Sequence, residues 1–138
     1  MDSQSQPTAA ATPHELTLDP LVQAYFDGFN SQDYGAVAAL FGADGILIPP
    51  FEAGLVGAQA IQAYLHAEAA GMRARPLEVE TQTLPDHSRQ IIVKGRVATP
   101  LFTVSVGWGF VLRADHTLHQ VEIRLLASLS ELLQFRRS

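Results

Sequence analysis

The strongest constraint on the fold is a change of hydrophobic period near Leu77. Before it, apolar residues recur every three or four positions, as they do on the buried face of an α-helix. After it, apolar and polar residues alternate, as they do in a strand with one buried face. Because helical segments come first and strands follow as a block, the pattern predicts an α+β fold, with helices on one face of a curved antiparallel sheet.

Three helices are expected before the change of period. Asp19 is a good N-cap and Pro20 suits the first helical position, so the first helix begins there. A second helix is expected over 32–41 and a third over 58–70, with a turn at 42–45 and a short buried strand at 46–48 between them. Residues 1–17 are expected to be a flexible tail, and residues 18–138 to form one domain.

Long strands are expected after residue 77, at 89–98, 101–113 and 117–126, followed by a short helix that Ser128 caps. A bent sheet whose concave face is covered by helices leaves a conical space that side chains do not fill completely. The predicted architecture is therefore a cone-shaped sheet with three N-terminal helices over its concave face and a small apolar cavity inside.

Charge and composition argue against several classes of partner. The net charge is −5, so we expect no affinity for nucleic acid. There is no cysteine, the N-terminal segment lacks the apolar core of a signal peptide, and no apolar run reaches the ~20 residues of a membrane span. We therefore expect a cytoplasmic protein. No metal site is expected, because His116 and His119 would point to opposite faces.

Two aromatic residues are candidate polar anchors in the predicted cavity. Alternation puts the only tryptophan, Trp108, on the apolar face of its strand, and Tyr25 belongs to the apolar stripe of the first helix. Together they would offer two neutral hydrogen-bond donors to an apolar molecule with one acceptor, such as a ring ketone. The alternative is that both are core aromatics that donate to backbone carbonyls.

Candidate acid–base groups are few. Glu52 follows a Pro-Pro-Phe loop, and His119 shares a strand face with apolar residues, so either could reach the cavity. His66 and Glu68 are expected to be solvated, and Glu122 and Arg124 to form a surface pair of little energetic value. A small-molecule enzyme and a protein–protein interaction domain both stay open as alternatives to a ligand carrier.

Several segments carry a resemblance to a known family. They are the stretch Tyr25–Tyr34, Leu40-Phe41, the run from Gly45 to Glu52, Val56-Gly57, the run from Ile92 to Phe102, Trp108–Leu112, Leu125–Ser128 and Glu131–Leu133. These segments resemble nuclear transport factor 2-like domains. Within that superfamily they are most similar to the C-terminal domain of the cyanobacterial orange carotenoid protein and its free-standing homologues.

The resemblance implies a ketocarotenoid ligand, such as echinenone or canthaxanthin. Tyr25 and Trp108 would donate hydrogen bonds to its keto oxygen, and the other cavity positions would be Ala69, Met72, Ala74, Thr99, Pro100 and Phe102. The implied roles are carotenoid transfer, photoprotection or singlet-oxygen quenching. The implied partners are a second copy of the chain, in a homodimer around a shared chromophore, or a carotenoid-carrying helical protein.

The chain also departs from the family pattern. The segment between Pro100 and Trp108 is about four residues shorter, an even number that keeps Trp108 facing inward. In ketosteroid isomerase, an enzyme of the superfamily, a catalytic aspartate stands where this chain has Pro49, and an acid on the sheet falls close to Trp108. We therefore expect no catalytic residues and favour binding over turnover, with a SnoaL-like or isomerase-like enzyme as the alternative.

Overall fold

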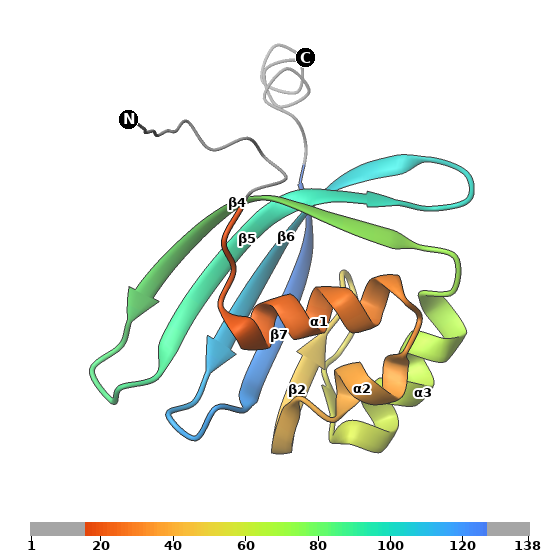
Figure 1. Ribbon diagram of the computed structural model, residues 1–138. Coiled ribbons are helices and arrows are strands. Elements are labelled where there is room, and N and C mark those ends of the chain that lie inside the picture. The colour runs from red at the N-terminus through yellow and green to blue at the C-terminus, as the bar shows by residue number, and fades with distance from the viewer. Residues whose placement is uncertain (1–15, 127–138) are drawn as a thin grey trace, which may run out of the picture.

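The computed structural model describes residues 16–126 as three helices packed against an open, curved sheet (Figure 1). The helices are α1 (Pro20–Asn30), α2 (Tyr34–Ala38) and α3 (Ala58–Glu68). The predicted start of α1 is confirmed, because the Asp19 side chain accepts a hydrogen bond of 2.8 Å from the backbone N–H of Leu21. No helix in this part of the chain is long and apolar enough to cross a membrane.

The sheet has six strands in the order β3-β2-β7-β6-β5-β4. They are β2 (Phe41–Ile48), β3 (Leu55–Val56), β4 (Arg73–Thr83), β5 (Arg89–Ala98), β6 (Thr103–Leu112) and β7 (Leu118–Leu126). Strands β4 to β7 form an antiparallel meander as predicted. The exception is β2, which pairs parallel with β7, so the sheet is mixed.

Three boundaries differ from the sequence prediction by three residues or more. The expected turn at 42–45 lies inside β2, where the register with β7 shifts between Phe41 and Ile46. The second helix ends at Ala38, because Phe41 already pairs with Leu118. Strand β4 begins at Arg73, before the alternation starts, and an irregularity after Pro76 accommodates the proline. The predicted C-terminal helix and most of the predicted N-terminal tail lie outside the described residues.

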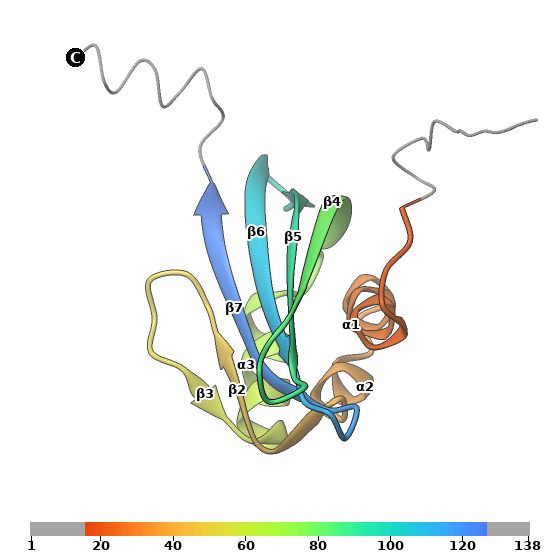
Figure 2. The same cartoon turned by 90° about the vertical axis from the view of Figure 1, so that its left-hand side faces the viewer.

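The core lies between α1 and the concave face of the sheet. Figure 2 shows α1 and α2 on one side of the curved strands. Alternation predicts an apolar face that runs from Phe102 to Leu112, and it is buried from Val106 to the end of β6, whereas Phe102, just before the strand, is 59% exposed. From α1, a stripe of apolar residues packs onto this face, and its buried members are Val22, Tyr25, Phe26 and Phe29. Each fully buried large side chain contributes about 1.5–3 kcal/mol relative to exposure.

A side-chain bridge fixes the end of α1 to the sheet edge. The Asn30 amide donates to the carbonyl of Ala74 at 2.9 Å and accepts from its N–H at 2.7 Å. These atoms belong to residues 44 positions apart, so the bridge joins the first helix to β4. It holds α1 over the concave face, where the cavity described next is formed.

Candidate ligand-binding cavity

An apolar cavity of about 310 Å³ lies between the helices and strands β5, β6 and β7. The strands supply one wall, α1 and α3 supply the other, and two loops and the end of β7 surround the opening. The lining residues are Phe29, Pro50, Phe51, Tyr64, Leu65, Glu68, Ala69, Met72, Val97, Thr99, Phe102, Val104, Val106, Trp108, Ile123 and Leu125.

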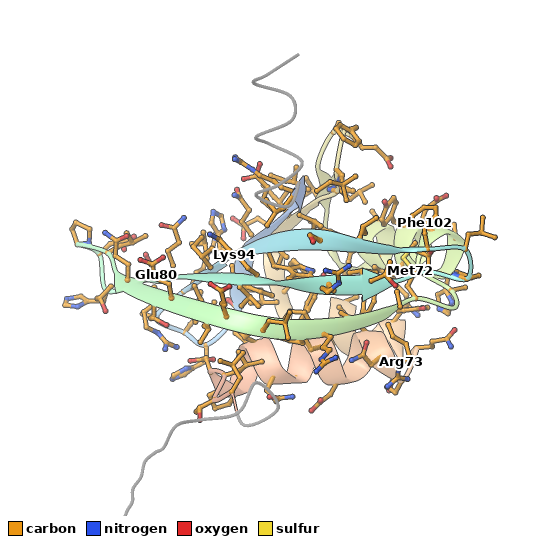
Figure 3. The ribbon with its side chains drawn as sticks, turned by 90° about the horizontal axis from the view of Figure 1, so that it is seen from above. Met72, Arg73, Glu80, Lys94 and Phe102 are labelled. Carbon is orange, nitrogen blue, oxygen red and sulfur yellow. The ribbon has the colours of Figure 1, made fainter. Side chains whose placement is uncertain are left out.

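Large apolar side chains stand exposed at the opening of this cavity. Phe51, in the loop after β2, is 93% exposed, and Phe102, in the loop before β6, is 59% exposed. Leu125, near the end of β7, is 48% exposed. These three residues define what we call the mouth. Figure 3 shows Phe102 and Met72 at the same end of the sheet.

An aromatic cluster closes the opposite end. The ring of Phe26 packs edge-on against Trp108, with ring centroids 4.8 Å apart, and against Tyr25 at 5.3 Å. Phe110 completes the cluster with an edge-on contact to Tyr25 at 5.1 Å. Phe29 lines the cavity and stacks on Tyr25 at 6.4 Å. Trp108 is therefore part of the cavity wall, and Tyr25 lies directly behind that wall.

The Tyr25 hydroxyl is buried without a hydrogen-bond partner. Burial is the main cause that raises the pKa of this phenol far above its usual value, and the neighbouring Tyr64 adds to the effect. Tyr25 is thus a neutral hydrogen-bond donor at any physiological pH. Tyr34, packed against Phe29 from α2, has the only other buried side-chain oxygen without a partner in the described part of the chain.

Five of the eight predicted ligand positions line the cavity: Ala69, Met72, Thr99, Phe102 and Trp108. Tyr25, Ala74 and Pro100 do not. Ala74 is occupied by its backbone bridge to Asn30, and Pro100 is exposed on the turn before β6. The Thr99 hydroxyl holds this turn together by donating to the carbonyl of Phe102 at 2.8 Å.

Sequence reasoning did not assign the other lining residues to a site. Val104 and Val106 could have been found, because they share the inward face of β6 with Trp108. Tyr64 and Leu65 follow Ile61 at helical spacing on the apolar face of α3, and Leu125 shares a strand face with Ile123, so these residues could have been found too. Phe51 carries no such signal, because a loop has no period.

Two carboxylates flank the opening on the side of α3. The Tyr64 hydroxyl donates to Glu52 Oε2 at 3.4 Å. Burial, then the nearby Glu52 and Glu68 charges, raise the pKa of Tyr64 to about 12. Glu68 itself lines the cavity. The candidate acid–base group Glu52 is therefore at the opening, where it is exposed to solvent.

The remaining titratable candidates lie away from the cavity lining. Arg113 Nη2 lies 2.7 Å from His119 Nδ1 and donates to Asp44 Oδ2 at 2.9 Å. Asp27 is exposed and accepts from Gln23. Glu122 and Arg124 form the predicted surface pair, with an N–O distance of 3.1 Å. No group of three potential metal ligands occurs within residues 16–126.

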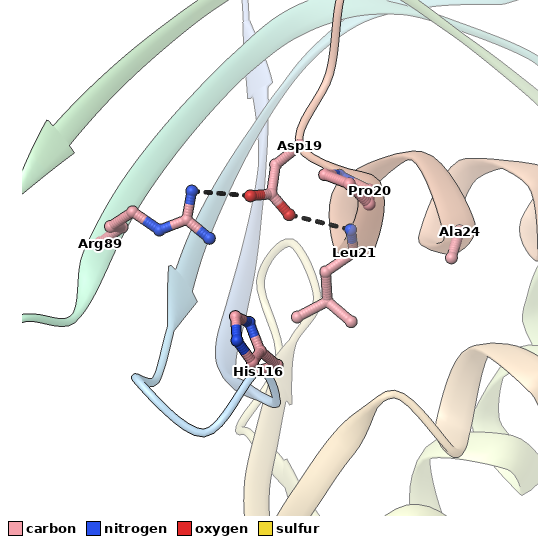
Figure 4. A pocket seen from close by; sticks show the side chains of 6 residues that line it. All are labelled: Asp19, Pro20, Leu21, Ala24, Arg89 and His116. Carbon is pink, nitrogen blue, oxygen red and sulfur yellow. Dashed lines mark hydrogen bonds and ion pairs between the residues drawn. The ribbon is translucent and has the colours of Figure 1, made fainter.

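A second hollow, of about 380 Å³, lies beside the start of α1 (Figure 4). Its charged residues are already paired, because Arg89 contacts Asp19 at 2.6 Å while Asp19 also caps the helix. His116 lies at its edge (Figure 4). This hollow has no unpaired buried polar group, and the apolar cavity is the stronger candidate for a binding site.

A model of the SnoaL-like domain family matches residues 22–122. The chain belongs to this family. The match runs from the first turn of α1 to the middle of β7, so it includes most of both walls of the cavity. A solved structure of nuclear transport factor 2 from Cryptosporidium parvum superposes with a TM-score of 0.66 over 76% of this chain and 88% of that one. At 18% identity it shows the shared nuclear transport factor 2-like fold.

This SnoaL-like domain is also similar to orange carotenoid proteins. It is 34% identical over 140 residues to the orange carotenoid-binding protein of Synechocystis sp., which covers 96% of this chain and 44% of that protein. A solved structure of the Anabaena (Nostoc) sp. PCC 7120 orange carotenoid protein binding canthaxanthin gives a TM-score of 0.78 at 31% identity, over 86% of this chain and 39% of that one. The chain spans less than half the length of these relatives.

Proposed function

We propose that this domain binds one end of a ketocarotenoid, such as canthaxanthin or echinenone, in the cavity between α1, α3 and the sheet. The observation that carries the proposal is an apolar cavity of about 310 Å³ whose closed end lies against a buried hydroxyl without a partner, that of Tyr25. The similarity to carotenoid-binding relatives, at 34% identity over 96% of this chain, supports it.

Tyr25 and Trp108 are the proposed anchors of the keto oxygen. A buried hydroxyl without a partner costs about 1–3 kcal/mol, and a ligand oxygen that accepts from it removes this cost. Phe29 separates Tyr25 from the cavity by stacking on its ring. We propose that Phe29 changes its side-chain position when the ligand enters. Of the other expected contacts, we propose those that line the cavity, Ala69, Met72, Thr99 and Phe102, whereas Ala74 and Pro100 lie outside its lining.

The size of the cavity and the exposed mouth bear on what covers the rest of the ligand. Small-molecule sites range over about 300–1,000 Å³, so this cavity is small and suits one ring end of a long polyene. The mouth residues Phe51, Phe102 and Leu125 are exposed apolar side chains that a partner would cover. We propose a cytoplasmic homodimer around a shared carotenoid, or transfer of the carotenoid to or from a helical carrier protein, in photoprotection or singlet-oxygen quenching.

Binding is favoured over catalysis because of where the titratable groups lie. Glu52 and Glu68 are at the opening, and the polar side-chain groups of the described aromatic cluster at the closed end are the Tyr25 phenol and the Trp108 indole. A general acid or base works within hydrogen-bond distance of the reacting atoms. A ligand whose carbonyl reaches the closed end would meet hydrogen-bond donors there and no carboxylate or imidazole.

The test is expression of the chain in a bacterial host that makes canthaxanthin. We expect a coloured purified protein whose absorption is shifted to the red of free canthaxanthin. Tyr25→Phe and Trp108→Phe each remove one proposed donor, so each is expected to weaken the colour or shift the absorption to the blue. Tyr34→Phe is the matched control, because it removes a buried unpaired hydroxyl outside the cavity.

Two results would contradict the proposal. One is a colourless protein from a host whose membranes contain canthaxanthin. The other is a Tyr25→Phe/Trp108→Phe double variant with the same absorption spectrum as the wild type, which would remove these two residues as anchors. Size-exclusion chromatography of the coloured and colourless protein tests the homodimer, which should elute at twice the mass of one chain when the ligand is bound.

A further inference from the structure

The charged groups around the cavity have one sign. Glu68 is the only charged residue among those that line it, and Glu52 accepts a hydrogen bond from the lining residue Tyr64. Both carboxylates act on the Tyr64 phenol, whose pKa is raised to about 12 by burial first and then by Glu52 and Glu68. Within residues 16–126, no arginine, lysine or histidine lines the cavity.

Two arginines of the neighbouring elements do not compensate for this charge. Arg124 lines a neighbouring groove that shares Phe51 and Leu125 with the cavity, but its guanidinium is 3.1 Å from Glu122 and its side chain is 71% exposed. Arg73 follows Met72 in the chain and is exposed, and Figure 3 shows it on the other side of β4 from Phe102. Among the described residues, an anion inside the cavity would therefore find no positive charge on the lining to pair with.

We propose that Glu52 and Glu68 make this site selective by charge, so that it accepts neutral carbonyl compounds and rejects carboxylic acids built on the same hydrocarbon scaffold. This inference rests on the proposed function and names the class of ligand that the site excludes. Fatty acids and carboxylic acids of the retinoid type belong to the excluded class, whereas ketones, aldehydes and esters do not.

The physical basis has two parts. Any carboxylate loses hydration when it enters an apolar cavity, and that cost is not recovered without a cation or several donors. Glu52 and Glu68 add repulsion, which is stronger near a low-dielectric cavity than in water and is reduced by salt. The first part is common to apolar cavities, while the second belongs to this chain and can be removed by mutation.

The experiment compares methyl retinoate with retinoate, which differ by a neutral ester and a charged carboxylate. Binding to the full chain is followed at pH 7.5 and low salt through quenching of Trp108, the only tryptophan in the sequence and a residue of the cavity wall. We expect methyl retinoate to bind at least about tenfold more tightly than retinoate. In Glu52→Gln/Glu68→Gln, the ratio of the two dissociation constants should fall at least about threefold.

The matched control is Glu78→Gln/Glu80→Gln. It changes the net charge by the same amount on exposed positions of β4, and Figure 3 shows Glu80 at the opposite end of the sheet from Met72 and Phe102. Its affinity ratio should stay within about 1.5-fold of the wild-type ratio, because the Coulomb energy between two charges falls with distance and water surrounds these exposed carboxylates.

Equal affinity for the two retinoids overturns the inference, and so does a ratio that Glu52→Gln/Glu68→Gln leaves unchanged. Failure of both retinoids to bind also overturns it, since the site is then not open to neutral carbonyl compounds of this size. The canthaxanthin experiment reports separately on the proposed function. A coloured protein that binds retinoate as well as its ester would keep the carrier function and remove the charge selectivity.

Discussion

The closed end of the cavity and its mouth are built in different ways. At the closed end, Phe26 and Phe110 come from a helix and a central strand, and both are at most 2% exposed. At the mouth, Phe51 and Phe102 come from loops and are 93% and 59% exposed. Packing at the closed end therefore stabilises the fold. The apolar surface at the mouth contributes little to folding and is free to contact a ligand or partner.

The largest expected effect is on the free energy of unfolding, and it differs between these two regions. Phe110→Ala removes a fully buried ring that contacts Tyr25 and Phe26, and it should lower the free energy of unfolding by about 3–5 kcal/mol. Phe51→Ala at the mouth should change it by less than about 0.5 kcal/mol. Urea denaturation followed by circular dichroism measures both. Similar losses in the two variants would mean that the mouth is part of the core.

The next effect concerns alkaline pH and the two tyrosines of these regions. The pKa of buried Tyr25 is raised further than that of Tyr64, which is raised to about 12. Below pH 10 both phenols are neutral in the folded and unfolded states. Above it the unfolded chain ionises while the folded chain keeps its protons, so stability is lost as pH rises. For Tyr25 the loss is about 1.4 kcal/mol for each pH unit above 10.

Denaturation midpoints between pH 9 and pH 11.5 measure this loss. Tyr25→Phe and Tyr64→Phe should each flatten the decline, because both phenols keep their protons in the folded protein over this range. A decline that neither substitution flattens would show that the folded protein does not hold these two protons.

The smallest expected effect is a gain in stability. Because the Tyr25 hydroxyl is buried without a partner, Tyr25→Phe should raise the stability of the ligand-free protein by about 1 kcal/mol near pH 7. Tyr34→Phe should give a similar gain, but only Tyr25→Phe should also weaken ketocarotenoid binding. Thermal denaturation together with the absorption spectrum separates the two. A loss of stability in Tyr25→Phe would show that its hydroxyl makes a favourable contact in the folded protein.

Most secondary structure and the inward faces of the strands could be predicted from local pattern. Strand β5 has the predicted bounds, and β6 buries the predicted alternate residues, Trp108 among them. These features depend on the periodicity of side-chain directions within a single strand or helix, and the spacing of apolar residues in the sequence shows that periodicity. The irregular part of β2 could not be predicted, because two glycines within residues 42–45 are typical of a turn.

The candidate site was predicted less completely than the fold. Trp108 and four of the family-implied positions line the cavity, but Tyr25 lies behind Phe29. Helical spacing puts both residues on the buried face of α1 and cannot tell which of them lies closer to the cavity. Glu52 was expected to be able to reach the cavity, but the second carboxylate at the opening was missed. Glu68 was expected to be solvated, and it is both exposed and part of the lining, because it lies at the end of α3 where the helix meets the cavity.

The sequence by itself determined which segments become helices and strands and which side of each is apolar, because those properties repeat with the local geometry of the backbone. The tertiary structure alone decided the parallel pairing of β2 with β7, the Asn30–Ala74 bridge, and the depth of each aromatic ring in the cavity. These depend on contacts between residues far apart in the chain, and no local pattern specifies which distant surfaces meet.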